Sequence, residues 1–101
     1  MPVAAVQEFD VEAGDRSTTN YDAFAARLRA QDAPKGLILH TAGFTPDDVF
    51  RIFAVWESAE DFQRVADEVL APMVRSIPGA EEAGPPDRQY IYPLHDLQRL
   101  T

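Results

Sequence analysis

The stretch VFRIFAVWESAEDF, from Val49 to Phe62, decides the fold of this 101-residue chain. Its first half is rich in β-branched and aromatic residues, which predicts a strand that ends at Trp56, the only tryptophan. In its second half, Ser58 and Asp61 have the S-x-x-D spacing of a helix N-cap. The stretch therefore predicts a strand that passes directly into a helix, with Trp56 at the junction.

The residues after Ser58 carry the clearest helical pattern in the chain. Apolar residues recur there every three or four positions, which is the spacing of one face of an α-helix. That face consists of Phe62, Val65, Ala66, Val69, Leu70 and Met73. Pro72 lies within this pattern and has no backbone N–H to donate, so we expect a kink or a break near Leu70.

Two further strands and another helix are predicted before Val49. Gly36–Phe44 is a nearly continuous apolar run, and the Gly, Pro and Asp residues that follow it are typical of a hairpin turn. Upstream of Pro34, Asn20 is the expected N-cap of a helix. The apolar face of this helix is made of Tyr21, Phe24, Ala25 and Leu28. The β-branched residues of Val3–Val11 predict a first strand.

The chain closes with another predicted strand. Pro78–Arg88 is a polar connection rich in Pro and Gly, and Gln89–Leu97 has the composition of a strand. Pro93 within it indicates an edge position, because proline cannot donate to a neighbouring strand. The order β-α-β-β-α-β defines an α+β fold of the ferredoxin-like type, in which both helices lie on one face of a four-stranded antiparallel sheet.

The predicted central strands are apolar at successive positions, as in LIL of Leu37–Leu39 and IFAVW of Ile52–Trp56. A strand with one face in water alternates between apolar and polar residues. Both faces of the sheet are therefore expected to be covered. Because the helices cover only one face, the pattern predicts a homodimer in which a second copy covers the other.

Composition and charge narrow the class of protein. With 46% hydrophobic and 26% charged residues, the chain is expected to form a single globular domain over residues 1–101. Nine basic against 17 acidic residues give a net charge of −8, so neither a nucleic-acid nor a membrane partner is expected. The chain has no cysteine, no signal-peptide pattern and no long apolar run, which favours a cytoplasmic location.

Three segments resemble the antibiotic biosynthesis monooxygenase (ABM)-like domains of the dimeric α+β barrel superfamily. They are GLILHTAG, RIFAVWESAEDF and YIYPLHDL, and the likeness extends over essentially the whole chain. The resemblance implies a dimeric α+β barrel. Members of the superfamily include cofactor-free oxygenases of polyketide phenols, haem-degrading enzymes and lactone isomerases. Trp56 matches a tryptophan that lines the substrate pocket of the oxygenases.

No cofactor and no metal are expected. Haem-degrading members of the superfamily hold iron through a histidine on the helix after the tryptophan strand, whereas the segment from Glu57 to Ile77 contains no histidine. The two histidines of the chain, His40 and His95, are about 55 residues apart and lack the spacing of metal ligands.

His40 is the first candidate for acid–base catalysis, because histidine is the side chain whose ordinary pKa lies closest to neutrality. It interrupts an apolar strand, where an imidazole needs a partner, a water or a ligand. If His40 pairs with Ile52, it shares a sheet face with Trp56. The alternative is a hydrogen-bonded histidine in the core or at the dimer interface. His95, on the last predicted strand, is either an interface residue or a second pocket group.

Tyrosines supply further candidates. Tyr90 and Tyr92 alternate onto one face of the last strand, and Tyr21 lies on the apolar face of the first helix. Their hydroxyls can orient a phenol or an enol, or the rings can fill an interface. We take Tyr92 as the second catalytic candidate beside His40. Arg51 has the opposite parity to Trp56, which favours pairing with an acidic neighbour over binding a substrate carboxylate.

The predicted function follows from these residues together with the resemblance. The expected substrate-binding residues are Trp56, Ile52, Phe24, Leu28, Phe62, Val69 and His95. The leading hypothesis is a cofactor-independent monooxygenase, isomerase or cyclase that takes a proton from a small aromatic, polyketide-like or enolisable metabolite in an apolar pocket. The alternative is a non-catalytic ligand-binding or structural protein, which a filled interior would favour.

Overall fold

The computed structural model describes residues 1–79 and 84–100 and has the predicted order of elements. The strands are β1 (Val3–Asp10), β2 (Leu37–Phe44), β3 (Val49–Trp56) and β4 (Arg88–Pro93). The helical elements are α1 (Thr19–Arg29), α2 (Ala59–Val65), the π-helical turn η1 (Ala66–Leu70) and α3 (Ala71–Arg75). Residues 80–83, which belong to the predicted connection Pro78–Arg88, lie outside the described residues.

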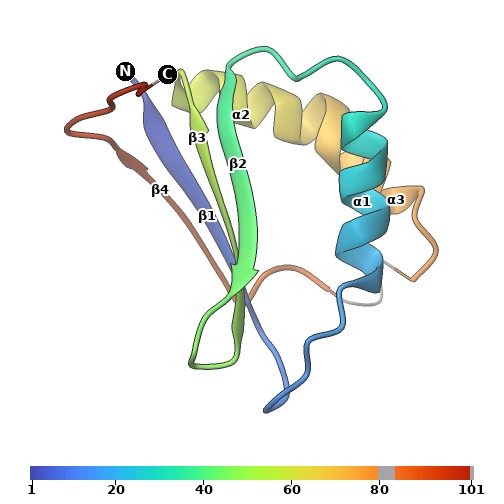
Figure 1. Ribbon diagram of the computed structural model, residues 1–101. Helices are drawn as coiled ribbons and strands as arrows, with labels where there is room; N and C mark the ends of the chain where they lie inside the picture. The colour runs from blue at the N-terminus through green and yellow to red at the C-terminus, as the bar shows by residue number, and fades with distance from the viewer. Residues whose placement is uncertain (80–83, 101) are drawn as a thin grey trace.

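The strands form one antiparallel sheet in the order β2-β3-β1-β4, with the helices on a single face (Figure 1). This is the ferredoxin-like α+β arrangement, so the predicted fold class is confirmed. β4 is an edge strand, as Pro93 indicated, but it ends at Pro93 instead of Leu97. Beyond Pro93 the backbone N–H of Leu94 donates to the carbonyl oxygen of Pro2 (2.9 Å), and His95 lies outside the strand.

The junction between β3 and α2 forms as its sequence predicts. Ser58 is the N-cap of α2, and its Oγ accepts a hydrogen bond from the backbone N–H of Asp61 (3.1 Å). Gly36, which leads into β2, has a φ of +93°, and a Cβ added there would lie 2.6 Å from the side chain of Asp61. Only glycine satisfies both the backbone angle and the close approach at this position.

The second helical segment is interrupted near Leu70, as the position of Pro72 indicated. The π-helical turn η1 ends at Leu70, and α3 resumes with Pro72 in its first turn. Regular α-helical hydrogen bonding cannot continue through Pro72, because proline lacks an N–H and its ring clashes with the preceding turn. The wider turn before Pro72 accommodates this defect.

The predicted cap of the first helix is wrong. α1 begins at Thr19, so Asn20 lies in its first turn, and Thr18 occupies the N-cap position. Thr18 Oγ1 donates to Asp22 Oδ2 (2.8 Å) rather than accepting from the backbone. Thr18, Thr19 and Asn20 are all competent caps, so the sequence alone does not select among them.

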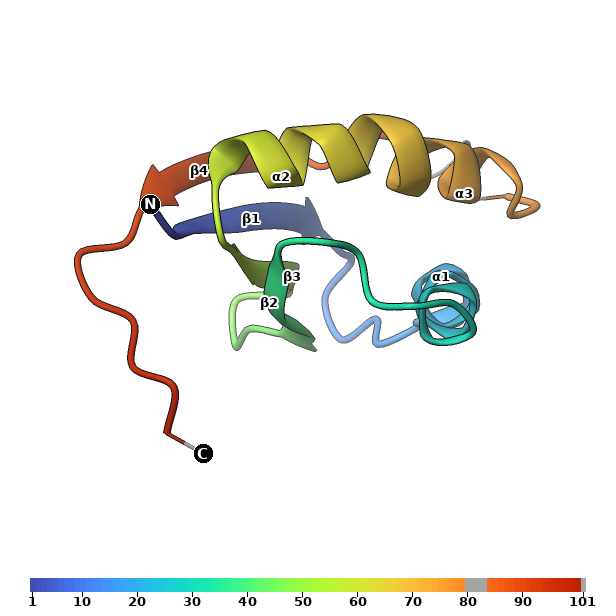
Figure 2. The same ribbon diagram turned by 90° about the horizontal axis from the view of Figure 1, so that it is seen from above.

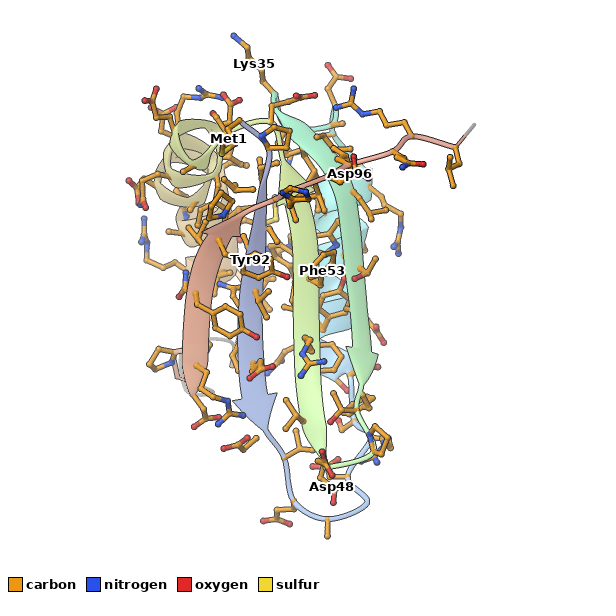
Figure 3. All side chains as sticks on the ribbon, turned by 90° about the vertical axis from the view of Figure 1, so that its left-hand side faces the viewer. Met1, Lys35, Asp48, Phe53, Tyr92 and Asp96 are labelled. Carbon is orange, nitrogen blue, oxygen red and sulfur yellow. The ribbon has the colours of Figure 1, made fainter. Side chains whose placement is uncertain are left out.

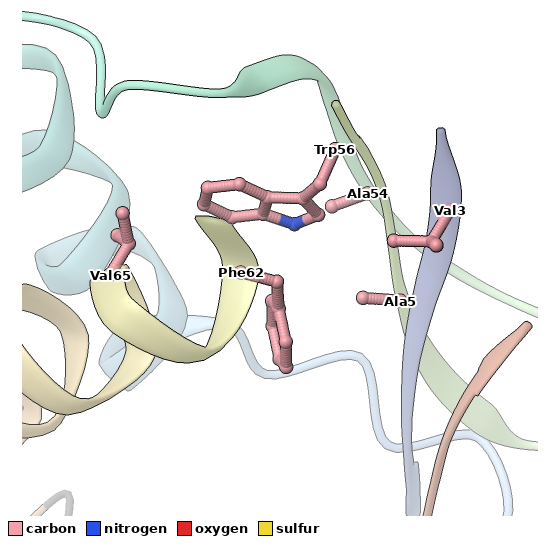
Figure 4. Packing of buried hydrophobic residues seen from close by; sticks show 6 residues of the cluster. All are labelled: Val3, Ala5, Ala54, Trp56, Phe62 and Val65. Atoms are coloured by element: carbon pink, nitrogen blue, oxygen red, sulfur yellow. The ribbon is translucent and has the colours of Figure 1, made fainter. Parts of the chain in front are cut away.

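The hydrophobic core lies between the sheet and α2. Its buried cluster consists of Val3, Ala5, Ala54, Trp56, Phe62 and Val65. Figure 4 shows the Trp56 ring reaching from β3 toward α2, where it meets Phe62 edge to face with ring centroids 5.6 Å apart. Trp56 is 2% exposed, so the tryptophan at the strand-to-helix junction is a core residue.

The opposite side of the sheet, which we call the helix-free face, is partly apolar (Figure 3). The strand register places the following side chains on it: Ala4, Val6, Glu8, Leu39, Arg51, Phe53, Val55, Arg88, Tyr90 and Tyr92. Leu39, Tyr90 and Tyr92 are each more than 40% exposed. An apolar surface of this kind is typical of a contact with another protein surface.

A charged cluster around Glu8 lies on the helix-free face. Glu8 is buried and forms ion pairs with Arg51 and Arg88, each with an N–O distance of 2.7 Å. The hydrogen bond from Arg88, followed by that from Arg51, holds the pKa of Glu8 below its usual value. The prediction that Arg51 pairs with an acidic neighbour is therefore confirmed.

The segment after β4 leaves the sheet on its helix-free side (Figure 2). Figure 3 shows it crossing the ends of the strands near Asp96. Arg99 Nη2 and Glu57 Oε1 are 2.7 Å apart and tie this segment to the end of β3. Over residues 1–79 and 84–100, none of the helices is long and apolar enough to span a membrane.

Candidate functional site

A cavity of about 770 Å³ lies between the helix-bearing face of the sheet and the helices. Aromatic and aliphatic side chains make up much of its wall, among them Phe24, Phe50, Ile52, Trp56, Phe62 and Leu70. Polar residues complete it, including Gln7, Asn20, Gln63 and Gln89, and two charged side chains, Asp67 and Arg75, also line it. The size suits a small organic molecule of several rings, and an apolar wall with a few polar groups is typical of such sites.

Small residues keep this space open. Ala5 and Ala54 are cross-strand partners on β1 and β3, and both line the cavity. Ala66 and Ala71, on η1 and α3, face it from the helices. Because alanine fills little volume, the sheet and the helices can pack together at Trp56 and still leave a void next to it.

His40 lies on the cavity wall, although its strand register differs from the predicted one. It pairs with Ala54, not Ile52, and the pairing of β2 with β3 is irregular between Leu37 and Leu39. The difference is two residues along β3, so the side chain stays on the same face. His40 and Trp56 therefore share the helix-bearing face, as the sequence suggested.

An aromatic group from α1 and β3 surrounds His40. Tyr21 Oη is 3.4 Å from His40 Nδ1, and the two rings are nearly parallel, with an interplanar angle of 7°. The ring of Phe24 lies 6.4 Å from the imidazole, and Phe50 meets Tyr21 edge to face at 5.2 Å. All four residues line the cavity.

Burial controls the charge of both polar members of this group. It lowers the pKa of His40 below its ordinary value of 6.5, because desolvation disfavours the imidazolium cation. It raises the pKa of Tyr21 above its ordinary value of 10.0, because desolvation disfavours the phenolate. At neutral pH the cavity therefore holds a neutral imidazole, which can accept a proton, beside a neutral phenol.

Comparison with known proteins identifies the fold. No family model matches the sequence, and no curated protein is similar to it in sequence. Solved structures do match. SnoaB, a cofactor-independent oxygenase from Streptomyces nogalater, is 20% identical, with 95% of each chain covered and a TM-score of 0.62. A provisionally named antibiotic biosynthesis monooxygenase from Deinococcus radiodurans is 10% identical, with 100% of this chain and 99% of that chain covered and a TM-score of 0.64. The chain therefore has the same protomer fold as these two proteins, which we call the ABM-like fold.

A third structure with the ABM-like fold carries a different activity in its name. The heme-degrading protein Rv3592 from Mycobacterium tuberculosis is 26% identical, with 67% of this chain and 80% of that chain covered and a TM-score of 0.54. Proteins named as an oxygenase and as a haem-degrading protein thus share this architecture. The ABM-like fold by itself does not select a reaction, which has to be argued from the side chains of the cavity.

The ABM-like fold brings five of the predicted site residues to one cavity: His40, Trp56, Ile52, Phe24 and Phe62. The other four lie elsewhere. Leu28 is half-buried on α1 outside the lining, and Val69 packs against the core cluster. His95 lines a separate depression beside Glu57 and Arg99. Tyr92 pairs with Ala4 and points to the helix-free face, so its own protomer does not bring it to His40.

Tyr21 is the tyrosine that the structure places beside His40, and the sequence prediction chose Tyr92 instead. A signal for Tyr21 was present, because it shares the apolar helical face with Phe24. Its hydroxyl on an otherwise apolar face indicates a polar partner. What the sequence lacks is the packing of α1 against β2, which supplies that partner from a segment about 20 residues away.

Trp56 adds an unusual polar feature to the cavity wall. Its Nε1 is buried, and no described residue accepts a hydrogen bond from it. An unpaired buried donor costs about 1–3 kcal/mol. The tryptophan therefore has two properties at once: its ring anchors the core beside the candidate site, and its buried N–H has no partner among the described residues.

Proposed function

We propose that the protein is a small cofactor-independent enzyme that binds a flat aromatic or enolisable metabolite in the cavity. The observation that carries this proposal is the neutral imidazole of His40 on the wall of an apolar cavity of about 770 Å³. His40 takes up a proton released by the ligand. The reaction class is oxygenation, or the related isomerisation or cyclisation.

The walls of the cavity suit the anion that such a step produces. Removing a proton from a phenol or an enolisable ketone leaves a charge that is spread over the ring system. A delocalised anion has a low charge density, so it needs fewer direct polar contacts than a localised one, and its flat ring system fits among apolar side chains such as Trp56, Phe62 and Phe50. The imidazolium form of His40 then provides the balancing charge in a site of low polarity.

A non-catalytic ligand-binding or structural protein is the competing hypothesis. A structural role favours a filled interior, whereas the open cavity supports a ligand. A binding protein and an enzyme with this cavity differ in one step, the proton transfer at His40. Binding and proton transfer are therefore measured separately.

Binding is tested with anthrone, a flat tricyclic ketone that enolises to a phenol. Because Trp56 is the only tryptophan and lines the cavity, we expect anthrone to change its fluorescence. Ala54→Leu places a larger side chain on the cavity floor and is expected to weaken binding at least about tenfold, since overpacking costs about 1–3 kcal/mol. The measurement is a fluorescence titration, repeated by calorimetry.

Ala26→Leu is the matched control for this experiment. Ala26 is exposed on α1 and does not line the cavity, so the same substitution there leaves binding unchanged. The proposal fails if the unaltered protein binds no flat aromatic compound. It also fails if Ala54→Leu, folded by circular dichroism, binds anthrone as tightly as the Ala26→Leu control.

A second copy of the chain is the proposed cover of the helix-free face. The exposed side chains Leu39, Tyr90 and Tyr92 on that face support this proposal. The resemblance of the sequence to the dimeric α+β barrel superfamily supports it as well. A homodimer would bury these rings. It would also bring the charged cluster around Glu8 to the contact between the two sheets.

We expect Tyr92→Glu to convert the dimer to a monomer at micromolar concentration. The added carboxylate would have to be buried without a partner in the apolar contact, at a cost of several kcal/mol. Analytical ultracentrifugation measures the change. Ala59→Glu adds the same charge on the exposed start of α2 and is expected to leave the dimer intact. A monomeric unaltered protein, or a dimeric Tyr92→Glu variant, contradicts the proposed interface.

A further inference from the structure

Tyr21 and His40 are the one pair of acid–base side chains that the described part of the chain places in contact inside the cavity. Tyr21 Oη and His40 Nδ1 are 3.4 Å apart, and both residues are part of the lining. Phe24 and Phe50 pack beside them, so apolar rings hold both side chains in place. The pair joins α1 to β2, the next element along the chain.

The hydrogen bond between these two atoms can have one of two directions. Either the Tyr21 hydroxyl donates to an unprotonated Nδ1, or a protonated Nδ1 donates to the hydroxyl oxygen. The second direction leaves the Tyr21 hydrogen without an acceptor among the described residues, because His40 Nδ1 is the partner that the structure gives it. The first direction uses the better acceptor, since an imidazole nitrogen is far more basic than a phenol oxygen.

The other ring nitrogen of His40 supports the same direction. Nε2 makes no hydrogen bond with a described residue. Among the described residues, the one fully buried side-chain nitrogen or oxygen without a partner is Trp56 Nε1, so Nε2 of His40 is not fully buried. Nε2 is therefore open to water or to a ligand. A proton on Nε2 can be satisfied from that side, while the lone pair of Nδ1 is satisfied by Tyr21.

We propose that Tyr21 donates its hydroxyl hydrogen to His40 Nδ1, keeps the proton of the neutral imidazole on Nε2, and relays the proton of the ligand to His40. This relay rests on the proposed function, whereas the hydrogen bond and the position of the imidazole proton do not. Tyr21 Oη takes a proton from an acidic C–H or O–H of the ligand as its own hydroxyl proton passes to Nδ1. The ligand becomes an anion, the imidazole becomes a cation, and the tyrosine stays neutral.

The hydrogen bond is tested without any ligand by nitrogen NMR of the protein with isotope-labelled histidines. The chain has only two histidines, so His40→Gln assigns both sets of signals. Above the pKa of His40, we expect Nε2 to show the shift of a protonated nitrogen and Nδ1 that of an unprotonated nitrogen that accepts a hydrogen bond. In Tyr21→Phe, the Nδ1 signal is expected to move to the position of an acceptor with no donor.

Tyr90→Phe is the matched control, since it removes the same hydroxyl from a ring on the helix-free face. It leaves the Nδ1 signal of His40 in place, and the signals of His95 serve as a reference in every spectrum. A protonated Nδ1 in the unaltered protein overturns the proposal. An Nδ1 signal that does not move in Tyr21→Phe overturns it as well.

The relay is tested by the rate at which the protein exchanges the acidic CH₂ hydrogens of anthrone for deuterium. Tyr21→Phe is expected to slow this exchange at least about tenfold, and Tyr90→Phe to leave it unchanged. Because the two residues act as a unit, Tyr21→Phe combined with His40→Gln is no slower than His40→Gln alone. Full exchange activity in Tyr21→Phe overturns the relay. If the unaltered protein exchanges nothing, the proposed function and the relay both fail, and NMR still decides the hydrogen bond.

Discussion

Replacing His40 with glutamine is expected to slow proton abstraction from an enolisable aromatic ligand by about 10²- to 10⁴-fold, the usual contribution of a positioned general base. The measurement is the exchange of the CH₂ hydrogens of anthrone for deuterium, followed by proton NMR in oxygen-free D₂O. Excluding oxygen separates proton transfer from any oxygenation that follows it. Binding of anthrone to the variant, read from Trp56 fluorescence, is expected to change much less than the exchange rate.

The physical reason lies in the protonation state of the cavity. Burial lowers the pKa of His40, so its neutral form is present at neutral pH and can accept a proton. Glutamine fills a similar space and offers hydrogen bonds, yet it cannot take up a proton in this pH range. As the pH falls through the lowered pKa of His40, the imidazole becomes protonated and the exchange rate of the unaltered protein is expected to fall with it.

His95→Gln is the control for this prediction. It removes the other histidine of the chain, which lies in the separate depression beside Glu57 and Arg99. We expect the exchange rate of this variant to equal that of the unaltered protein. If His40→Gln exchanges anthrone as fast as His95→Gln, His40 is not the proton acceptor, and a binding protein becomes the better account of the cavity.

Trp56→Ala is expected to lower the free energy of unfolding by about 3–5 kcal/mol, the usual cost of removing a buried large aromatic side chain. Trp56 is 2% exposed and packs edge to face on Phe62, so the substitution removes a core contact and enlarges a cavity that is already open. Urea unfolding followed by circular dichroism, at one protein concentration for all variants, measures the change.

Trp56→Phe is the comparison variant. Phenylalanine retains a ring that can pack on Phe62 and removes the indole N–H, which lacks a hydrogen-bond partner among the described residues. We therefore expect a clearly smaller loss of stability than in Trp56→Ala. A loss below about 1 kcal/mol in Trp56→Ala would mean that Trp56 is not a core anchor, because surface substitutions give losses of that size.

The predictions that succeeded rest on residues close to one another in the chain. The S-x-x-D spacing placed Ser58 as the cap of α2, and Pro72 predicted the interruption that the structure has as η1. Runs of β-branched, aromatic and apolar residues between turn residues predicted four strands, and Pro93 marked β4 as an edge. Caps, turns and helical faces depend on neighbours within a few positions, so the sequence carries them directly.

The errors concern contacts between distant segments. His40 pairs two residues away from the position considered in the sequence, because the hairpin register runs from Phe44 opposite Phe50 to His40 opposite Ala54, and the apolar pattern does not specify it. Tyr92 was assigned to the site although the register of β4 on β1 turns it to the other face. Tyr21 was one of three candidate tyrosines, and the sequence did not single it out, because its partner, His40, comes from another element.

The sequence by itself determined the order of the elements, the ferredoxin-like sheet and the position of Trp56 where β3 enters α2. These features follow from local geometry and from the handedness of β-α-β connections, which restrict the chain to few arrangements. The cavity, the meeting of Tyr21 with His40 and the unpaired N–H of Trp56 came from the packing of α1 and α2 on the sheet. Such features depend on strand register and on the volume of side chains that meet across the core, and one residue of slip or one methyl group changes them.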